Sequence, residues 1–258
     1  MTDPLLQLDD VKVWFGGVKA VDGVSLTIEP GKLYGIIGPN GSGKTTLINA
    51  ITRLAPLTAG TIRFAGQDIS DAPPHVVARA GLARTFQAIR LLPTLTVREN
   101  ILLGTDHVPV CVDGGGGSRR EQRRNERKRA SEAVDRAIER LGLAAVADEL
   151  PASLPYGTQR RVEIARSVAS GCRLLMLDEP IAGMSRGERD EIAAVLRSLR
   201  EEGLTQILIE HDLRMVLKTC DYLYVLNLGT NLADGEPSET VARRDVQTAY
   251  LGKSHAHA

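Results

Sequence analysis

Short apolar segments that alternate with amphipathic helical segments predict an α/β fold with a mostly parallel sheet. Two of the segments, Leu33–Ile37 and Leu174–Leu177, are continuously apolar, which is typical of strands buried on both faces of a parallel sheet. A block of helical character from about Arg90 to Ser170 separates them. The simplest architecture is therefore a sheet flanked by helices, with a helical subdomain inserted between its two halves.

The N-terminal quarter of the chain is predicted to be rich in strands. The expected strands are Leu5–Trp14, Val24–Glu29, Leu33–Ile37 and Thr61–Phe64. The first two are separated by the turn-forming Phe15-Gly16-Gly17. After Leu33–Ile37 a glycine-rich segment is expected to turn into a helix that runs through about Arg53.

The later elements follow from helical and strand patterns in the second half. Residues between Glu132 and Leu143 have helical spacing, and this helix is expected to end near Gly142. Arg186–Glu202 is predicted to be an amphipathic helix that Gly203 terminates. The remaining predicted elements are the strand Leu174–Leu177, the strand Thr205–Ile209, the helix Leu213–Lys218 and the strand Tyr222–Leu226.

A glycine-rich and then basic stretch interrupts the helical block. Asp113–Ser118 contains four consecutive glycines, and Arg119–Arg129 contains seven basic and two acidic residues. This pattern favours a flexible loop that leads into a solvated helix. A basic patch that meets lipid headgroups or a partner is the alternative.

Composition excludes several classes of protein. The 258 residues carry 32 basic and 32 acidic side chains, and aromatic residues make up 3%, which argues against a nucleic-acid partner. Cys111, Cys172 and Cys220 have neither metal-binding nor disulfide spacing, which suits a reduced compartment. The start lacks the pattern of a signal peptide, and no run of 18 apolar residues occurs, so a role at a membrane would require a partner.

The segment Gly38–Thr45 matches the phosphate-binding pattern G-x-x-x-x-G-K-[ST] in full, between an apolar strand and a helix. Glycines let the backbone bend around a phosphate, and the helix that follows adds the positive end of its dipole. Lys44 is expected to reach the β- and γ-phosphates, and the Thr45 hydroxyl to bind Mg²⁺. The predicted nucleotide-binding residues of this segment are Asn40, Gly41, Ser42, Gly43, Lys44, Thr45 and Thr46.

Two carboxylates follow the second apolar strand. Asp178 is predicted to bind Mg²⁺, directly or through water, and Glu179 to act as the general base that polarises the attacking water. Taken alone, such a pair could equally cap a helix. The phosphate-binding pattern upstream favours the catalytic interpretation.

With these motifs the chain resembles the ABC (ATP-binding cassette) ATPases over nearly its whole length. The resemblance implies that Gln87, in Arg84-Thr85-Phe86-Gln87, contacts Mg²⁺ and water and senses a transmembrane partner. It implies that His211, after the strand Thr205–Ile209, contacts the γ-phosphate, and that Phe15 stacks on adenine, a role that Trp14 could take instead. Glu179, His211, Lys44 and Gln87 would be the catalytic residues, with ATP and Mg²⁺ as cofactors.

The resemblance also implies a domain organisation. Residues 1–258 would form a single ABC ATPase domain, with a RecA-like core from 1–89 and 171–258. An antiparallel N-terminal β-subdomain would join this core, and 90–170 would form the helical subdomain with the signature motif.

The signature motif departs from the family pattern. Leu154-Pro155-Tyr156-Gly157-Thr158 stands where the family has Leu-Ser-Gly-Gly-Gln, so Pro155 replaces a serine that supplies a hydroxyl and an N–H to the γ-phosphate of a partner's nucleotide. Ser185 replaces the family's Asp or Asn in the loop at the dimer seam. Because the phosphate-binding side looks intact and the signature weakened, we expect an asymmetric pair, with a heterodimer favoured over a homodimer.

One branch of the family is especially similar: the ATPases of branched-chain amino-acid (LIV-type) importers. The similar segments are Gly81–Gln87, Leu95–Asn100, Pro180–Met184 and Ala249–Gly252. The resemblance implies a peripheral subunit on the cytoplasmic face of the cell membrane. Its partners would be a second ATPase subunit, two membrane permease subunits and, indirectly, an extracytoplasmic binding protein.

Other functions remain open at this stage. The cargo could be another small polar solute, such as urea or an amide, because the binding protein and the permease recognise it. Pro155 and Ser185 are compatible with a nucleotide-binding regulatory subunit with one degenerate site. An exporter ATPase, or an ABC-type ATPase without a permease, is disfavoured by the LIV-type resemblance and by the single cassette.

Overall fold

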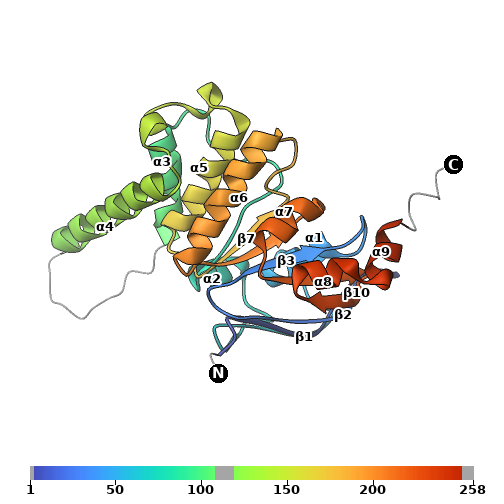
Figure 1. Cartoon of the computed structure of the whole chain (residues 1–258). Coiled ribbons are helices and arrows are strands. Elements are labelled where there is room, and N and C mark those ends of the chain that lie inside the picture. The colour runs from blue at the N-terminus through green and yellow to red at the C-terminus, as the bar shows by residue number, and fades with distance from the viewer. Residues whose placement is uncertain (1–2, 108–118, 252–258) are drawn as a thin grey trace.

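The computed structural model describes residues 3–107 and 119–251. Cys111, the glycine-rich Asp113–Ser118 and Gly252 therefore lie outside the described residues. The described chain contains two sheets, with most of the helices on one side of the larger sheet (Figure 1).

The smaller sheet is antiparallel and comes from the N-terminal part of the chain. Its strand order is β2-β1-β4-β5, and its strands are β1 (Leu6–Phe15), β2 (Val18–Ile28), β4 (Ala59–Phe64) and β5 (Gln67–Asp68). Leu6 pairs with Ile28 on one side and with Phe64 on the other. All three are buried and help to form one hydrophobic core with residues of the larger sheet.

The larger sheet is mostly parallel and has the order β10-β9-β3-β8-β7-β6. Its strands are β3 (Leu33–Ile37), β6 (Leu82–Arg84), β7 (Leu174–Asp178), β8 (Thr205–Ile209), β9 (Tyr222–Asn227) and β10 (Thr230–Gly235). Within the larger sheet, among the described residues, only the pairing of β9 with β10 is antiparallel. Every residue of β3, β7 and β8 is buried, as the continuous apolar runs predict. The predicted fold class is confirmed.

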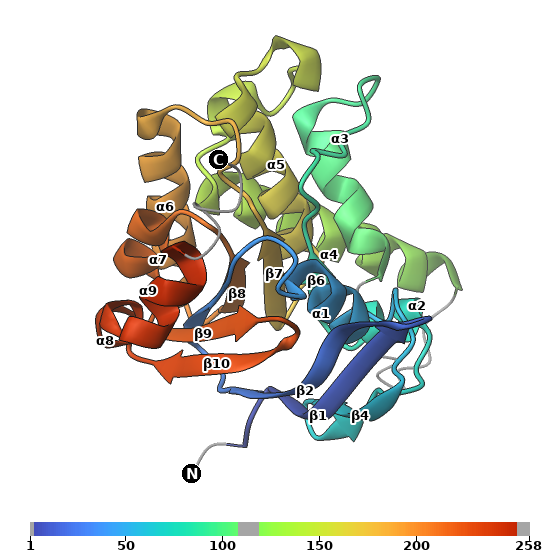
Figure 2. The ribbon, with the colours of Figure 1, turned by 90° about the vertical axis from the view of Figure 1, so that its right-hand side faces the viewer.

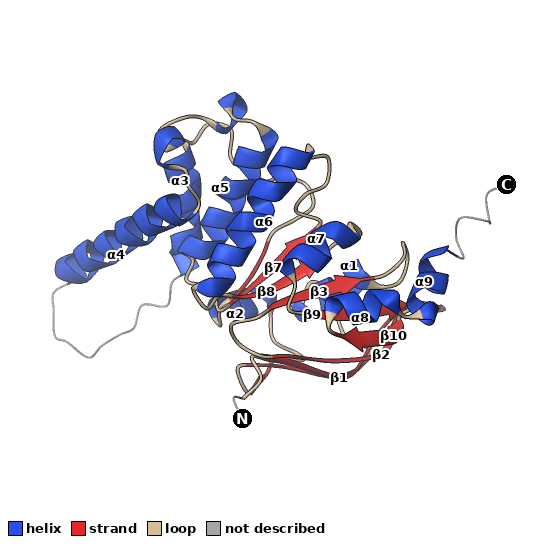
Figure 3. Ribbon diagram, viewed as in Figure 1, coloured by secondary structure: helices blue, strands red, loops and turns tan. Residues whose placement is uncertain are grey.

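Helices cover the larger sheet and lie against its ends (Figure 3). They are α1 (Lys44–Ile51), α2 (Pro74–Arg79), α6 (Arg186–Glu201), α7 (Leu213–Thr219), α8 (Pro237–Ala242) and α9 (Arg244–Leu251). The buried face of α6 includes Ile192, Leu196 and Leu199, which pack in a second hydrophobic core with Leu175 and Leu177 of β7. Burial of these apolar side chains fixes α6 against the sheet.

A helical region lies between β6 and β7 in the chain. It contains α3 (Val97–Leu102), α4 (Arg119–Arg140) and α5 (Tyr156–Ala169), with short 3₁₀ turns at Leu103–His107, Ala144–Val146 and Pro151–Ser153. These helices gather at one end of the molecule, and the N-terminal half of α4 projects from it (Figures 1 and 2). The division at residues 89/90 and 170/171 stays a prediction.

Several elements differ from the sequence-based expectation. β2 begins at Val18 rather than Val24 because residues 18–22 also pair with β1, with Trp14 opposite Lys19. β6 is only three residues long and is defined by its pairing with β7. The elements that the sequence did not indicate are α2, β5, β6, β10, α8 and α9.

Candidate functional site

The parallel register brings the predicted site segments to one edge of the larger sheet. Ile36 of β3 and Asp178 of β7 both pair with Ile209 of β8. The chain therefore leaves β3 into Gly38–Thr45, leaves β7 at Glu179 and leaves β8 toward His211 at the same level of the sheet. A crevice at the carboxyl edge of such a sheet is the usual ligand position in α/β folds.

Gly38–Thr45, which is predicted to bind phosphate and is called the phosphate-binding loop below, has a backbone that only glycine accommodates at two points. At Gly38 (φ +156°) a Cβ atom would lie 2.2 Å from the Leu226 carbonyl oxygen and 2.6 Å from Ser42 Oγ. At Gly43 (φ +100°) a Cβ would lie 2.4 Å from the Ala20 carbonyl oxygen. The loop is thus held tightly between β9 and β2, and α1 begins directly after it at Lys44.

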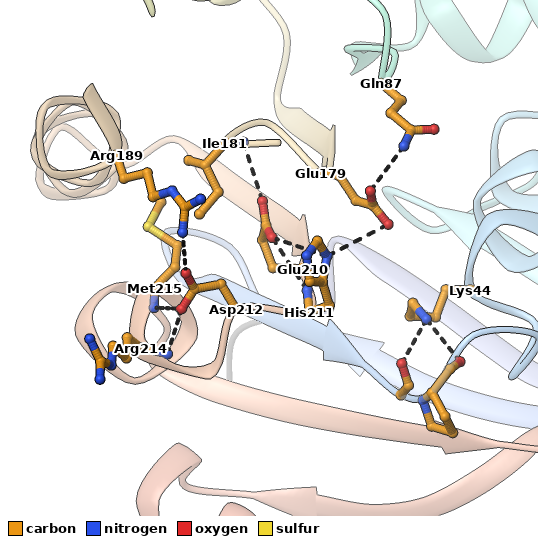
Figure 4. A network of polar contacts seen from close by, with 12 residues as sticks. Lys44, Gln87, Glu179, Ile181, Arg189, Glu210, His211, Asp212, Arg214 and Met215 are labelled. Carbon is orange, nitrogen blue, oxygen red and sulfur yellow. Dashed lines mark hydrogen bonds and ion pairs between the residues drawn. The ribbon is translucent and has the colours of Figure 1, made fainter. Parts of the chain in front are cut away.

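Polar groups inside this loop are arranged as a phosphate cradle requires. The Lys44 side chain is largely buried, and its Nζ donates to the carbonyl oxygens of Gly38 at 2.7 Å and Pro39 at 3.1 Å (Figure 4). Ser42 Oγ is buried and has no hydrogen-bond partner among the described residues. An unsatisfied buried hydroxyl in a native fold calls for a ligand or water, and the first N–H groups of α1 have no acceptor within the helix.

Asp178 is held by an arginine that the sequence analysis gave no role. Arg84 Nη2 lies 2.8 Å from Asp178 Oδ2, and both side chains are about nine-tenths buried. Arg84 Nη1 also donates to Asn49 Oδ1 of α1 at 2.6 Å. Arg84 therefore links β6, β7 and α1 and fixes the orientation of the Asp178 carboxylate. Only the pairing of β6 with β7 reveals this contact.

Glu179, Gln87 and His211 converge beyond the end of β7 (Figure 4). Gln87 Nε2 donates to Glu179 Oε2 at 3.0 Å, and His211 Nδ1 lies 3.9 Å from Glu179 Oε1. Glu179 adopts φ +47°, in the left-handed region that a non-glycine residue seldom occupies. Such strained residues cluster at functional sites. The His211 side chain is 62% exposed, so it can contact a ligand.

A buried glutamate connects this group to the segment after Glu179. Glu210 is fully buried, and its carboxylate accepts from the backbone N–H groups of Ile181 and His211, each at 3.3 Å (Figure 4). Burial raises the pKa of the Glu210 carboxyl above its ordinary value, and the neighbouring Glu179 adds to this rise. Glu210 positions the backbone on both sides of the site. The sequence analysis did not identify Glu210, because it assigned the functional role to the adjacent His211.

The aromatic pair at the end of β1 separates into two roles. Trp14 Nε1 donates to Asp22 Oδ1 at 3.2 Å, and Lys19 Nζ lies 4.7 Å from the centre of the indole ring. Phe15 is 53% exposed. Because Asp22 and Lys19 already contact the Trp14 indole, the more exposed Phe15 ring is the better candidate for stacking on a base.

The signature segment begins α5 and contacts the start of α6. Pro155 is the N-cap residue and makes no side-chain cap hydrogen bond. Instead, Gly157 N donates to Glu188 Oε1 at 3.1 Å. Ser185 and Glu188 form the capping box of α6, so the hydroxyl of Ser185 stabilises this helix terminus.

The donors suit a hard cation that uses few protein ligands. No group of three or more His, Cys, Asp or Glu side chains that could hold a metal occurs in the described parts of the chain. The Thr45 hydroxyl, Asp178 carboxylate and Gln87 amide oxygen are hard oxygen donors. Mg²⁺ characteristically binds one or two protein oxygens and completes its shell with water and phosphate oxygens.

The two cysteines in the described parts of the chain are poor candidates for thiol chemistry. Cys172 and Cys220 are free, and burial raises the pKa of each thiol to about 12, which keeps it protonated. No helix in 3–107 or 119–251 combines the length and apolar character of a membrane span.

Comparison with known proteins gives consistent matches over nearly the whole chain. The family model described as ABC transporter matches residues 21–182. The chain is 40% identical to the high-affinity branched-chain amino acid transport ATP-binding protein BraF of Pseudomonas aeruginosa, over 98% of this chain and 100% of that protein. It is also 40% identical to the corresponding protein LivG of Escherichia coli K12, with the same coverage.

Solved structures agree. An ATP-binding cassette of an ABC transporter in its ADP conformation matches with a TM-score of 0.83 at 32% identity, covering 97% of this chain and 100% of the other. A dimeric ATP-binding cassette bound to ADP and Pi matches with a TM-score of 0.70 at 26% identity, covering 90% of this chain and 98% of the other.

Proposed function

Because this chain belongs to the ABC transporter family of ATP-hydrolysing cassettes, we propose that it powers an importer of branched-chain amino acids. The observation that supports this best is the convergence of Lys44, Glu179, Gln87 and His211 at one sheet edge, in a chain 40% identical over its length to two branched-chain amino acid transport ATP-binding proteins.

In this proposal the site residues share the work of hydrolysis. The phosphate-binding loop and Lys44 hold the β- and γ-phosphates of ATP, and Phe15 stacks on the adenine. Glu179 accepts a proton from water as the water oxygen bonds to the γ-phosphorus and the bond to the ADP oxygen breaks. Gln87 orients Glu179 and the water, and His211 stabilises charge on the γ-phosphate.

Magnesium fits the same arrangement. Thr45, Asp178 and Gln87 would hold Mg²⁺, which neutralises charge on the phosphate oxygens when bound. Arg84 already fixes one oxygen of Asp178 and leaves the other for the ion.

Partner subunits would complete the transporter. ATP would lie between this chain's phosphate-binding loop and the signature segment of a second ATPase subunit, and two permease subunits would receive the motion at the cytoplasmic membrane face. A groove of about 320 Å³ is the candidate docking site for a permease. Its walls include the exposed Leu54 and Leu103, and Phe86 beside Gln87. An apolar groove next to the glutamine that contacts Glu179 would transmit permease movement to the site.

The test separates nucleotide binding from hydrolysis. Lys44→Ala should weaken ATP binding strongly, measured by calorimetry with Mg²⁺ present. Glu179→Gln should retain binding and lower ATP turnover by about 10²-fold or more in the assembled transporter. Lys32→Ala, an exposed lysine paired with Glu29, is the matched control and should change neither. Unchanged binding in Lys44→Ala would refute the site.

The cargo requires its own measurement. Vesicles that contain this subunit with its second ATPase subunit and its permeases, with ATP inside and the binding protein outside, should take up labelled leucine in an ATP-dependent manner. Uptake of urea or an amide in place of leucine would keep the ATPase assignment and overturn the proposed cargo.

A further inference from the structure

A fully buried arginine on the signature helix holds the backbone of the glutamine loop. Arg160 of α5 has no exposed surface. Its Nη1 donates to the Phe86 carbonyl oxygen at 2.7 Å, and its Nη2 donates to the Gln87 carbonyl oxygen at 2.7 Å. A guanidinium removed from water needs acceptors for its donors. Both Nη groups of Arg160 find them in these two carbonyls, whereas Nε has none among the described residues, so the two contacts define the path of the loop.

Two further residues extend this contact along one face of α5. Glu163 Oε2 lies 2.6 Å from Arg160 Nη1, and Glu163 Oε1 lies 3.8 Å from Arg166 Nη2. Arg166 Nη1 in turn donates to the Arg90 carbonyl oxygen at 2.7 Å. Side chains three residues apart share a helix face. Arg160 and Arg166, linked through Glu163, therefore bind three carbonyl groups between residues 86 and 90.

The opposite side of the same loop contacts the reaction centre. While Arg160 holds the carbonyl of Gln87, the side-chain amide of Gln87 donates to Glu179 at 3.0 Å. The helix that carries Arg160 starts at Tyr156, next to Pro155 of the signature segment. A shift of α5 would thus move Gln87 relative to Glu179.

We propose that Arg160 is a positioning residue that makes the placement of Gln87 against Glu179 depend on the position of the signature helix. This inference rests on the proposed function and assigns a further residue to it. Arg160 acts through Gln87 and makes no contact with the reacting atoms. Engagement of the signature segment by a second subunit's nucleotide would then adjust Gln87 in the site of the same chain.

The decisive variant removes the clamp while keeping the core filled. Replacement of a buried ion pair by apolar residues of similar volume is often neutral or stabilising, so Arg160→Met combined with Glu163→Leu should fold. In the assembled transporter its kcat should fall by about 10²-fold, as expected when a catalytic group is misplaced by about 1 Å, with the KM for ATP little changed. Arg160→Lys should recover part of the loss.

Arg200→Gln is the matched control. Arg200 also makes a tight ion pair, with Asp221 at 2.6 Å, but Asp221 precedes β9 at the sheet edge opposite the site. The kcat of the Arg200→Gln variant should equal that of the wild type. A folded double variant with wild-type kcat would overturn the proposal, as would an equal loss in Arg200→Gln.

Two readouts exclude a purely structural role. If Arg160 acts through Gln87, adding the double substitution to Gln87→Ala should lower kcat no further, whereas additive losses would contradict the proposal. Hydrogen exchange of the backbone amides of residues 86–90, without nucleotide, should accelerate in the double variant and not in Arg200→Gln. Unchanged exchange would overturn the clamp even if ATP hydrolysis were confirmed, while a wild-type chain without ATP binding would instead refute the proposed function.

Discussion

Glu179 is placed by a left-handed backbone conformation that residues with a side chain seldom adopt. Its φ of +47° turns the chain sharply after Asp178, and its N–H donates to the Ile209 carbonyl oxygen at 3.0 Å. The turn aims the carboxylate toward Gln87 and His211 while Asp178 stays in the strand. Two adjacent carboxylates thereby face different partners, which a general base and a metal ligand require.

Phe15 is predicted to contribute to the affinity for ATP by stacking on the adenine. Phe15→Ala should weaken ATP binding by about 1–3 kcal/mol, the usual contribution of a base stacked on an aromatic ring. Phe15→Trp should keep the affinity. Calorimetric titration of each variant measures the effect, and Leu217→Ala, an exposed apolar residue on α7, serves as the control. A larger loss in Trp14→Ala than in Phe15→Ala would assign the stacking role to Trp14.

Glu210 predicts a distinctive dependence of stability on pH. Because burial raises its pKa in the folded state, the folded protein binds the proton more tightly than the unfolded chain. The stability from this proton is full below the ordinary pKa of a glutamate and is lost as pH rises through the raised value. Glu210→Gln removes the titration and leaves one oxygen to accept from either Ile181 N or His211 N, which donate to different oxygens of the carboxylate, so the variant also loses one of these two hydrogen bonds at every pH.

The measurement is the melting temperature of both proteins between pH 4 and pH 8. The difference, Glu210→Gln minus wild type, should increase with pH, with each kcal/mol regained worth about 2–4 °C for a domain of this size. Glu201→Gln, at the exposed end of α6, should show no such trend. A difference that decreased with pH would mean that the buried carboxylate is stabilised in its charged form.

At the scale of elements, buried strands could be predicted and paired elements could not. Leu33–Ile37 and Thr205–Ile209 have the predicted bounds because continuous apolar runs carry their own signal. Gly142 and Gly203 have positive φ after helices, as expected of helix-terminating glycines. The short β6 exists through its pairing with β7, and no local pattern encodes a partner about 90 residues away.

In the candidate site, too, features formed by contiguous residues could be predicted, whereas contacts between distant residues could not. The tight turn of Gly38–Thr45 could be predicted because all its residues are contiguous and glycine geometry is local; its binding of phosphate stays a prediction. The contacts of Arg84 with Asp178 and of Arg160 with Phe86 join residues 94 and 74 positions apart. A single sequence has no feature that pairs such residues, so their roles required the structure.

At the scale of the whole molecule, the chain would contribute two unequal halves to a dimer. Its predicted phosphate-binding segment keeps every residue of the motif, whereas the signature helix follows Pro155, which has no N–H and makes no side-chain cap hydrogen bond. Gly157 N, which could otherwise face a phosphate, donates to Glu188. This arrangement supports a heterodimer in which the second subunit supplies an intact signature to this chain's ATP.

The two ATP sites of such a dimer, each formed by the phosphate-binding loop of one subunit and the signature segment of the other, should hydrolyse ATP at different rates. Loss of one oriented donor typically costs about 2.7–4 kcal/mol in the transition state, or about 10²–10³ in rate. The site completed by Pro155 should therefore bind ATP but hydrolyse it slowly, and Glu179→Gln in the reconstituted pair should remove nearly all turnover. The same substitution in the second subunit's corresponding glutamate should remove little. Nearly full turnover after Glu179→Gln would show that the proline-containing site is competent, because only that site would remain.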